Sequence, residues 1–152
     1  MKVIYNDGHV AECPEEEELH VIRHTAAHIL AQAVKRLYPE AHFAYGPATE
    51  KGFYYDVDLG DKKLSDEDLP AIEAEMAKIV KENLPIKPFV LSREEAVKLM
   101  EERGEVYKVE HIGDLPEDAV LSFYQQGEYV DMCVGPHLCY TKGLKAFKLT
   151  QL

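Results

Sequence analysis

Apolar residues recur at intervals of three and four positions between residues 19 and 37, which is the spacing of one face of an α-helix. Pro14 and a run of four glutamates precede this segment, and both are typical of a helix start. Pro39 follows and ends the helix. We therefore predict a long helix whose main buried face is formed by Leu19, Ile22, Ala26, Ile29, Ala33 and Leu37.

Two further helices are predicted from their capping and turn residues. One begins after Ser65, ends before Pro85, and buries residues at helical spacing: Leu69, Ile72, Met76 and Ile79. The other starts at a capping box made by Ser92 and Glu95 and stops at Gly104.

Alternation of apolar and polar positions predicts the strands. Residues 1–13 form an N-terminal hairpin, and further strands are predicted at residues 52–57, 86–91, 106–112, 120–124, 128–134 and 144–149. The closing strands follow one another through short turns. We therefore expect an α+β fold, an antiparallel sheet packed with helices, in which residues 1–152 form one domain.

Composition and charge limit the classes of partner. The chain has 152 residues, 46% hydrophobic and 30% charged, which is typical of a soluble globular protein. A formal net charge of -11 argues against nonspecific binding along a duplex, so DNA is not an expected partner. The basic cluster Lys142, Lys145 and Lys148 would support a local contact with nucleic acid, or it would protect an exposed edge strand.

The three cysteines, an odd number, predict reduced thiols rather than a disulfide framework. The sequence has no basic segment leading into an apolar signal region and no apolar run of bilayer length. We therefore expect a cytoplasmic protein that does not interact with membranes.

Two histidines lie four positions apart on the predicted long helix, in the segment "RHTAAHIL". At about 100° per residue, His24 and His28 fall away from the main apolar stripe. They are therefore either two surface histidines or part of a site. A zinc protease motif is excluded, because Thr25 stands where that motif has a glutamate.

A second segment, "DMCVGPHL", places Cys133 four positions before His137 and on one strand face with Asp131. Two imidazoles, a thiol and a third imidazole are the ligand types of a zinc site. Taken singly, Cys133 also fits a buried structural cysteine, and His137 a turn residue.

With these two motifs, the segments "RHTAAHILAQAVKRLYP", "GPATEKGFYYD", "YKVE" and "YVDMCVGPH" closely resemble the editing domain of bacterial threonyl-tRNA synthetase. Alanyl-tRNA synthetase editing domains and their free-standing relatives share the two histidine motifs, but the segments between the motifs are similar to the threonyl kind. The resemblance covers the chain from about residue 20 to its end. It implies hydrolysis of the aminoacyl ester of mischarged seryl-tRNA(Thr), with the tRNA 3′ end and the catalytic domain of a parent synthetase as partners.

The resemblance also implies which residues form the site: His24, His28, Tyr55, Lys108, Asp131, Cys133 and His137. Ester hydrolysis needs a water, a proton acceptor, and donors or positive charge for the oxyanion. We expect His24 to accept the proton of water and Lys108 to position the water or stabilise charge. Tyr55 would contact the terminal adenosine.

The remaining members of this set would act around the seryl group. Asp131 would orient an imidazole or recognise the amino group, and Cys133 and His137 would line the serine pocket. We expect water attack rather than covalent catalysis by Cys133. From the residues alone, Lys108 would be read as an ordinary exposed strand lysine that shares a face with Val106 and Ile112.

Three alternatives stay open at this stage. The chain would be a free-standing deacylase for another mischarged tRNA, such as the alanyl type, or a non-catalytic module that binds the tRNA end and contains zinc. Zinc would be held by His24, His28, Cys133 and His137, as in alanyl relatives, but threonyl members are generally taken to work without it, and we expect no required cofactor. The third alternative concerns how much of a synthetase the chain represents. The ubiquitin-like domain usual before this region and the aminoacylation domain usual after it are missing. We therefore expect an excised piece of a synthetase rather than a free-standing protein.

Overall fold

The computed structural model describes residues 1–44 and 49–150, and the fold class is α+β as predicted. Residues 46–48 of the "GPATEKGFYYD" segment and the last two residues of the chain lie outside the described residues. Four α-helices are assigned in the described ranges: α1 (Glu18–Leu37), α2 (Leu69–Glu82), α3 (Arg93–Glu102) and α4 (Val106–Gly113). Single turns of 3-10 helix cover Glu15–Glu17, Asp66–Asp68 and Thr141–Gly143.

The strands of these ranges form three small antiparallel sheets rather than one. The first has the order β2 (Val10–Glu12), β1 (Lys2–Ile4), β8 (His137–Leu138), and the second pairs β3 (His42–Phe43) with β4 (Val57–Asp58). The third has the order β5 (Ile86–Ser92), β6 (Val120–Gln126), β7 (Tyr129–Met132). Strand β8 therefore leaves β7 and pairs with the N-terminal hairpin, although it follows β7 directly in the sequence.

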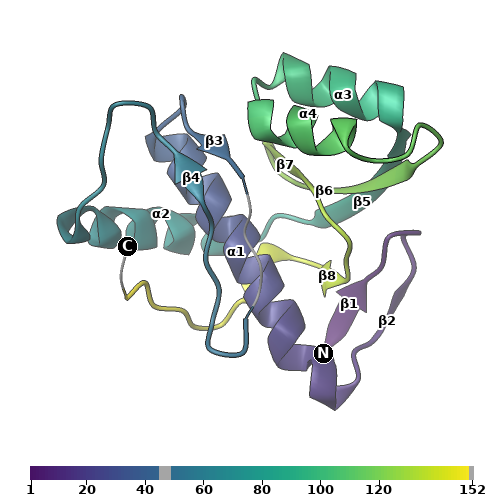
Figure 1. Cartoon of the computed structure of the whole chain (residues 1–152). Coiled ribbons are helices and arrows are strands. Elements are labelled where there is room, and N and C mark those ends of the chain that lie inside the picture. The colour runs from purple at the N-terminus through teal and green to yellow at the C-terminus, as the bar shows by residue number, and fades with distance from the viewer. Residues whose placement is uncertain (45–48, 151–152) are drawn as a thin grey trace.

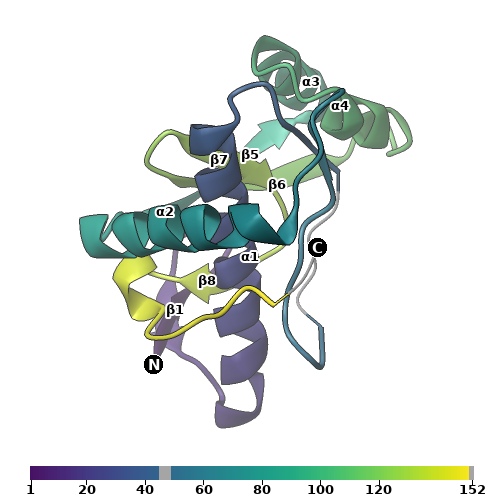
Figure 2. The same cartoon turned by 90° about the vertical axis from the view of Figure 1, so that its left-hand side faces the viewer.

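The three sheets and four helices are arranged around the long helix α1 (Figure 1). The helix α2 crosses α1 on one side, as Figure 2 also shows, while α3 and α4 cover one face of the β5–β6–β7 sheet. The hairpin β1–β2 and strand β8 lie beside the N-terminal half of α1 (Figure 1). The helix α1 thus lies between the α2 side and the β5–β7 side of the molecule.

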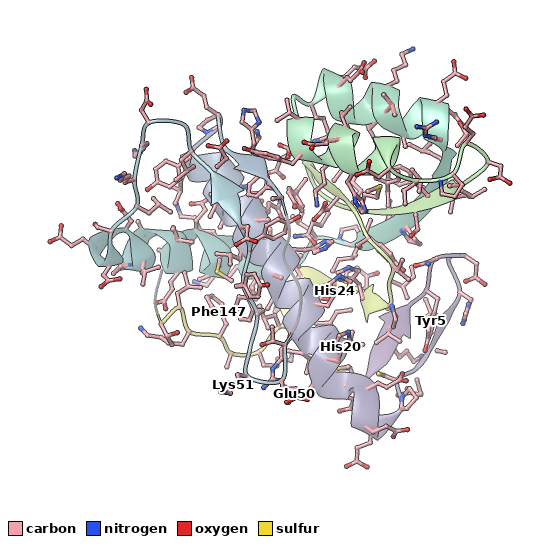
Figure 3. All side chains as sticks on the ribbon, in the orientation of Figure 1. Tyr5, His20, His24, Glu50, Lys51 and Phe147 are labelled. Atoms are coloured by element: carbon pink, nitrogen blue, oxygen red, sulfur yellow. The ribbon has the colours of Figure 1, made fainter. Side chains whose placement is uncertain are left out.

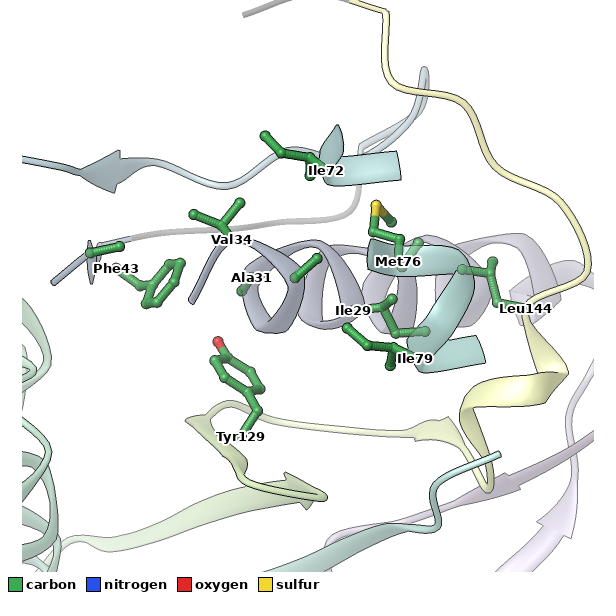
Figure 4. Close-up of a cluster of buried hydrophobic side chains, with 12 residues drawn as sticks. Ile29, Ala31, Val34, Phe43, Ile72, Met76, Ile79, Tyr129 and Leu144 are labelled. Carbon is green, nitrogen blue, oxygen red and sulfur yellow. The ribbon is translucent and has the colours of Figure 1, made fainter. Parts of the chain in front are cut away.

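The main hydrophobic core lies where α2 packs on α1 (Figure 4). Capping and turn residues explain where α2 and α3 begin and end. Ser65 forms a capping box at the 3-10 turn before α2, and Ser92 forms one at the start of α3. Asn83 ends α2 in the left-handed conformation. The buried side chains at the α1–α2 contact are Ala26, Ile29, Ala33, Val34, Ile72, Met76 and Ile79.

The predicted stripe of α1 is correct in its middle and wrong at its ends. Leu19 is 54% exposed and Leu37 is 37% exposed. The opposite side of the helix is buried too, including Ala27, Ala31 and His28. Because strands β7 and β8 cover that side, α1 is surrounded by protein along its middle, which one apolar stripe does not predict.

Three predicted strands are wrong in type or extent. Residues 106–112 lie in helix α4, and its buried residues, Lys108 and Ile112, are four positions apart, which places them on one helix face. Residues 144–149 form no strand, although half-buried Phe147 and Leu149 pack against the main core.

Within residues 52–57, only Val57 lies in a regular strand, β4. The predicted alternation is nevertheless present in the burial: Phe53, Tyr55 and Val57 are half-buried, and Tyr54 and Asp56 are exposed. The segment therefore has one half-buried face and one exposed face, but it does not form a long hydrogen-bonded strand.

The contrast between the middle and the ends of α1 leads to a test of packing. We predict that Ile29→Ala lowers the free energy of unfolding by about 2–5 kcal/mol, because Ile29 is fully buried in the main core. Leu19→Ala on the same helix is the control and should cost about 1 kcal/mol or less, because its side chain is mostly in water. Urea denaturation of both variants measures the difference, and equal costs would contradict the packing described for α1.

Candidate functional site

Two imidazoles project from one side of α1, one helical turn apart. The ring centroids of His24 and His28 are 5.0 Å apart and the rings meet edge to face. His28 is buried, and His24 is half-buried. Figure 3 shows His24 on α1 one turn beyond the exposed His20, with Tyr5 of the hairpin nearby and Glu50 and Lys51 below the helix. The reading of His24 and His28 as two surface histidines is therefore wrong.

The second motif meets the first across the fold. Cys133 directly follows β7, and His137 begins β8, where pairing with β1 fixes its backbone. The ring of His137 stacks on His24 with centroids 4.0 Å apart and lies 4.4 Å from the ring of His28. Its Nε2 atom is 3.3 Å from the Cys133 Sγ atom.

The ligand-type atoms of His24, His28, Cys133 and His137 all lie within 4.8 Å of one another. Three imidazole nitrogens and a thiol sulfur are chemically suited to a zinc ion. The residues present therefore fit the metal that the two motifs suggest.

A buried ion pair forms the other side of this cluster. The Lys108 Nζ atom is 3.0 Å from the Asp131 Oδ1 atom, and both side chains are almost inaccessible to solvent. Lys108 also donates hydrogen bonds to the Tyr55 hydroxyl at 3.0 Å and to the Ala44 carbonyl at 3.3 Å. Its ammonium group is thereby held between β7, β3 and the segment that carries Tyr55.

Asp131 is the most heavily bonded acceptor of the site. Its Oδ2 atom accepts hydrogen bonds from the hydroxyls of Tyr55 and Tyr129, and its Oδ1 atom accepts one from the Met132 amide. Oδ2 also lies 3.6 Å from the Nε2 atom of His28. The carboxylate therefore connects the lysine to the imidazole cluster.

The charges of the site follow from its burial. Burial would raise the pKa of Asp131, but the Lys108 ammonium and hydrogen bonds outweigh it and hold that pKa below its usual range. Burial lowers the pKa of His28 to about 3 and lowers the pKa values of His24 and His137 as well. Near pH 7 the imidazoles are therefore neutral, while the ion pair beside them is charged.

The Cys133 thiol is protonated in the same surroundings. Burial raises its pKa well above the ordinary value, and the nearby Asp131 carboxylate raises it further. A neutral thiol is a weak nucleophile.

All seven residues of the predicted set come together, but Lys108 reaches the site differently from the prediction. It lies on helix α4 and is buried, so the reading as an exposed strand lysine is wrong. The lysine cluster near the C-terminus is exposed, and Lys148 pairs with Glu73 at 3.3 Å. Since residues 144–149 form no strand, protection of an edge strand does not explain that cluster.

Two residues at the site were missed. Tyr129 lies two positions before Asp131 on β7, so the strand period alone places it on the same face. Thr25 is fully buried, and its Oγ1 atom is 2.9 Å from the His137 Nδ1 atom and accepts a hydrogen bond from the Leu138 amide. Only the crossing of α1 and β8 reveals that contact.

Tyr55 is also one of the residues that line a groove with a volume of about 860 Å³. Its floor is apolar, with Leu30 and Val34 of α1 among the lining residues, and its lining also includes four lysines, Lys51, Lys62, Lys63 and Lys148. The Arg23 guanidinium fixes one border by donating to the carbonyls of Thr49 and Glu50, both at 2.7 Å. The groove and the site share Tyr55, so a partly basic groove adjoins the site.

Comparison with known proteins identifies the family. Residues 121–151 match the family described as the threonyl and alanyl tRNA synthetase second additional domain. The threonine–tRNA ligase of Clostridioides difficile (strain 630) is 61% identical over 135 residues, which cover 89% of this chain and 21% of that protein. That of Carboxydothermus hydrogenoformans is 57% identical over 138 residues, covering 91% of this chain and 22% of that protein.

The similarity also extends over the N-terminal hairpin. The threonine–tRNA ligase of Clostridium novyi (strain NT) is 54% identical over 151 residues, covering 98% of this chain and 24% of that protein. The chain thus spans roughly a fifth to a quarter of the length of these curated relatives. Since the family match covers the Cys133–His137 motif and the relatives are all threonine–tRNA ligases, this chain belongs to the threonyl and alanyl tRNA synthetase second additional domain family, on its threonyl side.

Proposed function

We propose that residues 1–152 act as one editing domain that hydrolyses the aminoacyl ester of mischarged seryl-tRNA(Thr). The observation that carries the proposal is the meeting of a neutral, half-buried imidazole, His24, with a buried lysine–carboxylate pair at one site. The threonine–tRNA ligase relatives support the choice of tRNA. The partners are then the seryl-bearing 3′ end and the catalytic domain of a parent synthetase, in the cytoplasm.

The small difference in size between serine and threonine explains why such an activity is needed. Serine is threonine without one methyl group, and a pocket that accepts threonine rejects serine by only about 1–3 kcal/mol. A second site that admits serine and excludes the larger threonine removes the errors. The crowded side of the cluster, where Cys133 and His137 approach each other, is suited to this exclusion.

His24 is the proposed proton acceptor. Of the three clustered imidazoles it is the one that keeps contact with solvent, because His28 and His137 are buried. Burial keeps it neutral near pH 7, and stacking on the His137 ring, at 4.0 Å between centroids, orients its ring. A neutral, oriented imidazole is able to take a proton from water as the water attacks the ester.

Lys108 is proposed to position that water and to stabilise charge on the oxyanion. Asp131 and Tyr55 hold the ammonium in place, so its position is fixed before substrate arrives. With its contacts to Lys108 and His28, Asp131 is proposed to orient these groups, and the recognition of the serine amino group remains its second proposed role. The raised pKa of Cys133 supports attack by water rather than by the thiol.

The terminal adenosine is proposed to lie against Tyr55, in the 860 Å³ groove that Tyr55 helps to line. A volume of that order suits a nucleoside-sized group, because ligand pockets typically enclose about 300–1,000 Å³. The lysines of the groove supply local positive charge for phosphates in a chain whose net charge is -11.

The four-donor cluster favours one second candidate, a non-catalytic module that binds the tRNA end and holds a structural zinc ion. Bound zinc would be held by His24, His28, Cys133 and His137, and as a Lewis acid it would supply positive charge. Four protein ligands leave no position for a water, so such an ion would be structural unless one ligand left it. The Lys108 ammonium already supplies positive charge beside the cluster, which supports metal-independent hydrolysis.

The proposed mechanism predicts a large effect of His24→Ala. Removal of the His24 imidazole should lower the turnover of seryl-tRNA(Thr) roughly 100-fold, because in the proposed mechanism this ring accepts the proton of water. His20→Ala, one turn earlier on α1 and exposed, is the matched control and should keep the wild-type rate. A deacylation assay measures both, and wild-type turnover by a folded His24→Ala variant would move proton transfer to another group.

The lysine is tested separately, because its removal leaves the Asp131 carboxylate buried and unpaired. We expect Lys108→Met to lower turnover by at least roughly 10-fold, and the double variant Lys108→Met, Asp131→Asn to recover stability but not turnover. Thermal melting and deacylation of both variants separate the two effects. Recovery of turnover in the double variant would show that Lys108 serves the fold alone.

Metal dependence is expected to be absent. The purified protein should hydrolyse seryl-tRNA(Thr) at an unchanged rate after treatment with a chelator, because the proposed groups act without a metal. Elemental analysis of the same sample measures bound zinc. Stoichiometric zinc, with loss of hydrolysis on chelation and recovery on adding zinc back, would contradict this expectation.

A further inference from the structure

The N-terminal hairpin lies directly against the segment that carries the second motif. Strand β1 pairs with β8 so that Ile4 is opposite His137 and Val3 is opposite Leu138. Val3 and Leu138 are buried in a small core that also includes Tyr124. The hairpin therefore supports the backbone of a site residue from the side away from α1.

Asn6, the first residue of the hairpin turn, forms hydrogen bonds with residues outside the hairpin. The Oδ1 atom of Asn6 accepts a hydrogen bond from the backbone amide of Gly135 at 2.8 Å. Gly135 lies between Cys133 and His137. The same oxygen accepts a hydrogen bond from the Tyr124 hydroxyl at 2.8 Å.

Tyr124 also packs against the imidazole ring of His137. Its ring is 1% exposed, and its centroid lies 4.6 Å from the ring centroid of His137. Its hydroxyl also approaches the carbonyl oxygen of Ile4 at 3.3 Å. One amide oxygen of Asn6 therefore fixes both the loop before His137 and the ring packed against His137.

Gly135 shows how closely these groups fit. A Cβ atom added there would lie 1.9 Å from the hydroxyl oxygen of Tyr124 and 2.5 Å from its Cζ atom. No side chain fits without displacing the tyrosine. The loop between Cys133 and His137 is therefore packed tightly against Tyr124, and the Asn6 oxygen binds the amide of Gly135 within it.

We propose that Asn6 is a positioning residue, which acts through Gly135 and Tyr124 to set the placement of Cys133 and His137 in the site. The placement of Cys133 and His137 by Asn6 does not depend on which reaction the site performs, whereas the effect of Asn6 on turnover rests on the proposed hydrolysis of seryl-tRNA(Thr). Displacements of about 1 Å at a reacting centre lower rates up to roughly 100-fold. The hairpin thus contributes to the site although it contains none of the site residues.

Three variants of neighbouring turn residues test this role in the whole chain. Asn6→Ala removes the accepting oxygen, and Asn6→Asp keeps it. Asp7→Ala is the matched control in the same turn, because the exposed Asp7 side chain bonds only to His9 among the described residues. The readouts are the turnover and KM for seryl-tRNA(Thr), the NMR signals of the His137 ring and the Gly135 amide, and the melting temperature.

We expect Asn6→Ala to lower turnover roughly 10-fold to 100-fold with little change in KM, and to shift the His137 and Gly135 signals. Asn6→Asp should restore most of the turnover, and Asp7→Ala should match the wild type. Unchanged His137 and Gly135 signals in a folded Asn6→Ala variant would overturn the proposal, as would equal losses in Asn6→Ala and Asp7→Ala. If the wild type lacks hydrolysis, the proposed function fails, but shifts in Asn6→Ala alone still support the positioning.

Discussion

The site depends on the buried ion pair between Lys108 and Asp131. Taking two charges out of water costs several kcal/mol for each ion, and only close geometry with further hydrogen bonds offsets that cost. Here the ammonium has three acceptors, on β7, after β3 and on the Tyr55 segment, and the carboxylate has four hydrogen-bonded donors. Loss of either charge would leave the other unpaired in the interior. The pair therefore fixes the distance between α4, β7 and the Tyr55 segment, and with it the shape of the site.

The imidazole cluster is the neutral counterpart of this pair. Burial lowers the pKa values of all three clustered histidines, so their rings pack together as neutral groups at centroid distances of 4.0 to 5.0 Å. The proposed mechanism assigns charge and proton acceptance to different groups: Lys108 is paired with Asp131, and the neutral imidazole of His24 takes the proton. The cluster also has the ligand types of a zinc site, and the Lys108–Asp131 pair lies beside it.

The sequence predicts the parts of this arrangement that depend on local signals. The cap at Ser65, the capping box at Ser92 and the N-terminal hairpin are predicted correctly, and the two spaced motifs select the four cluster residues. The prediction around Lys108 fails, because the β-branched and aromatic residues of this short segment favour a strand, whereas its apolar residues at 106, 109 and 112 have helical spacing. The roles of Thr25 and Asn6 arise from contacts between distant segments, which spacing along the chain does not encode. The departure of β8 from β7 to join β1 is of the same kind.

The central claim is that this arrangement hydrolyses the smaller ester and spares the larger one. The most direct measurement compares deacylation of seryl-tRNA(Thr) and threonyl-tRNA(Thr) by the wild-type chain, at high protein concentration because the net charge of -11 leaves little attraction for the tRNA body. The account predicts rapid loss of the seryl ester and a threonyl ester that remains largely intact. Equal rates for the two esters, or no hydrolysis of either by the folded chain, would contradict it.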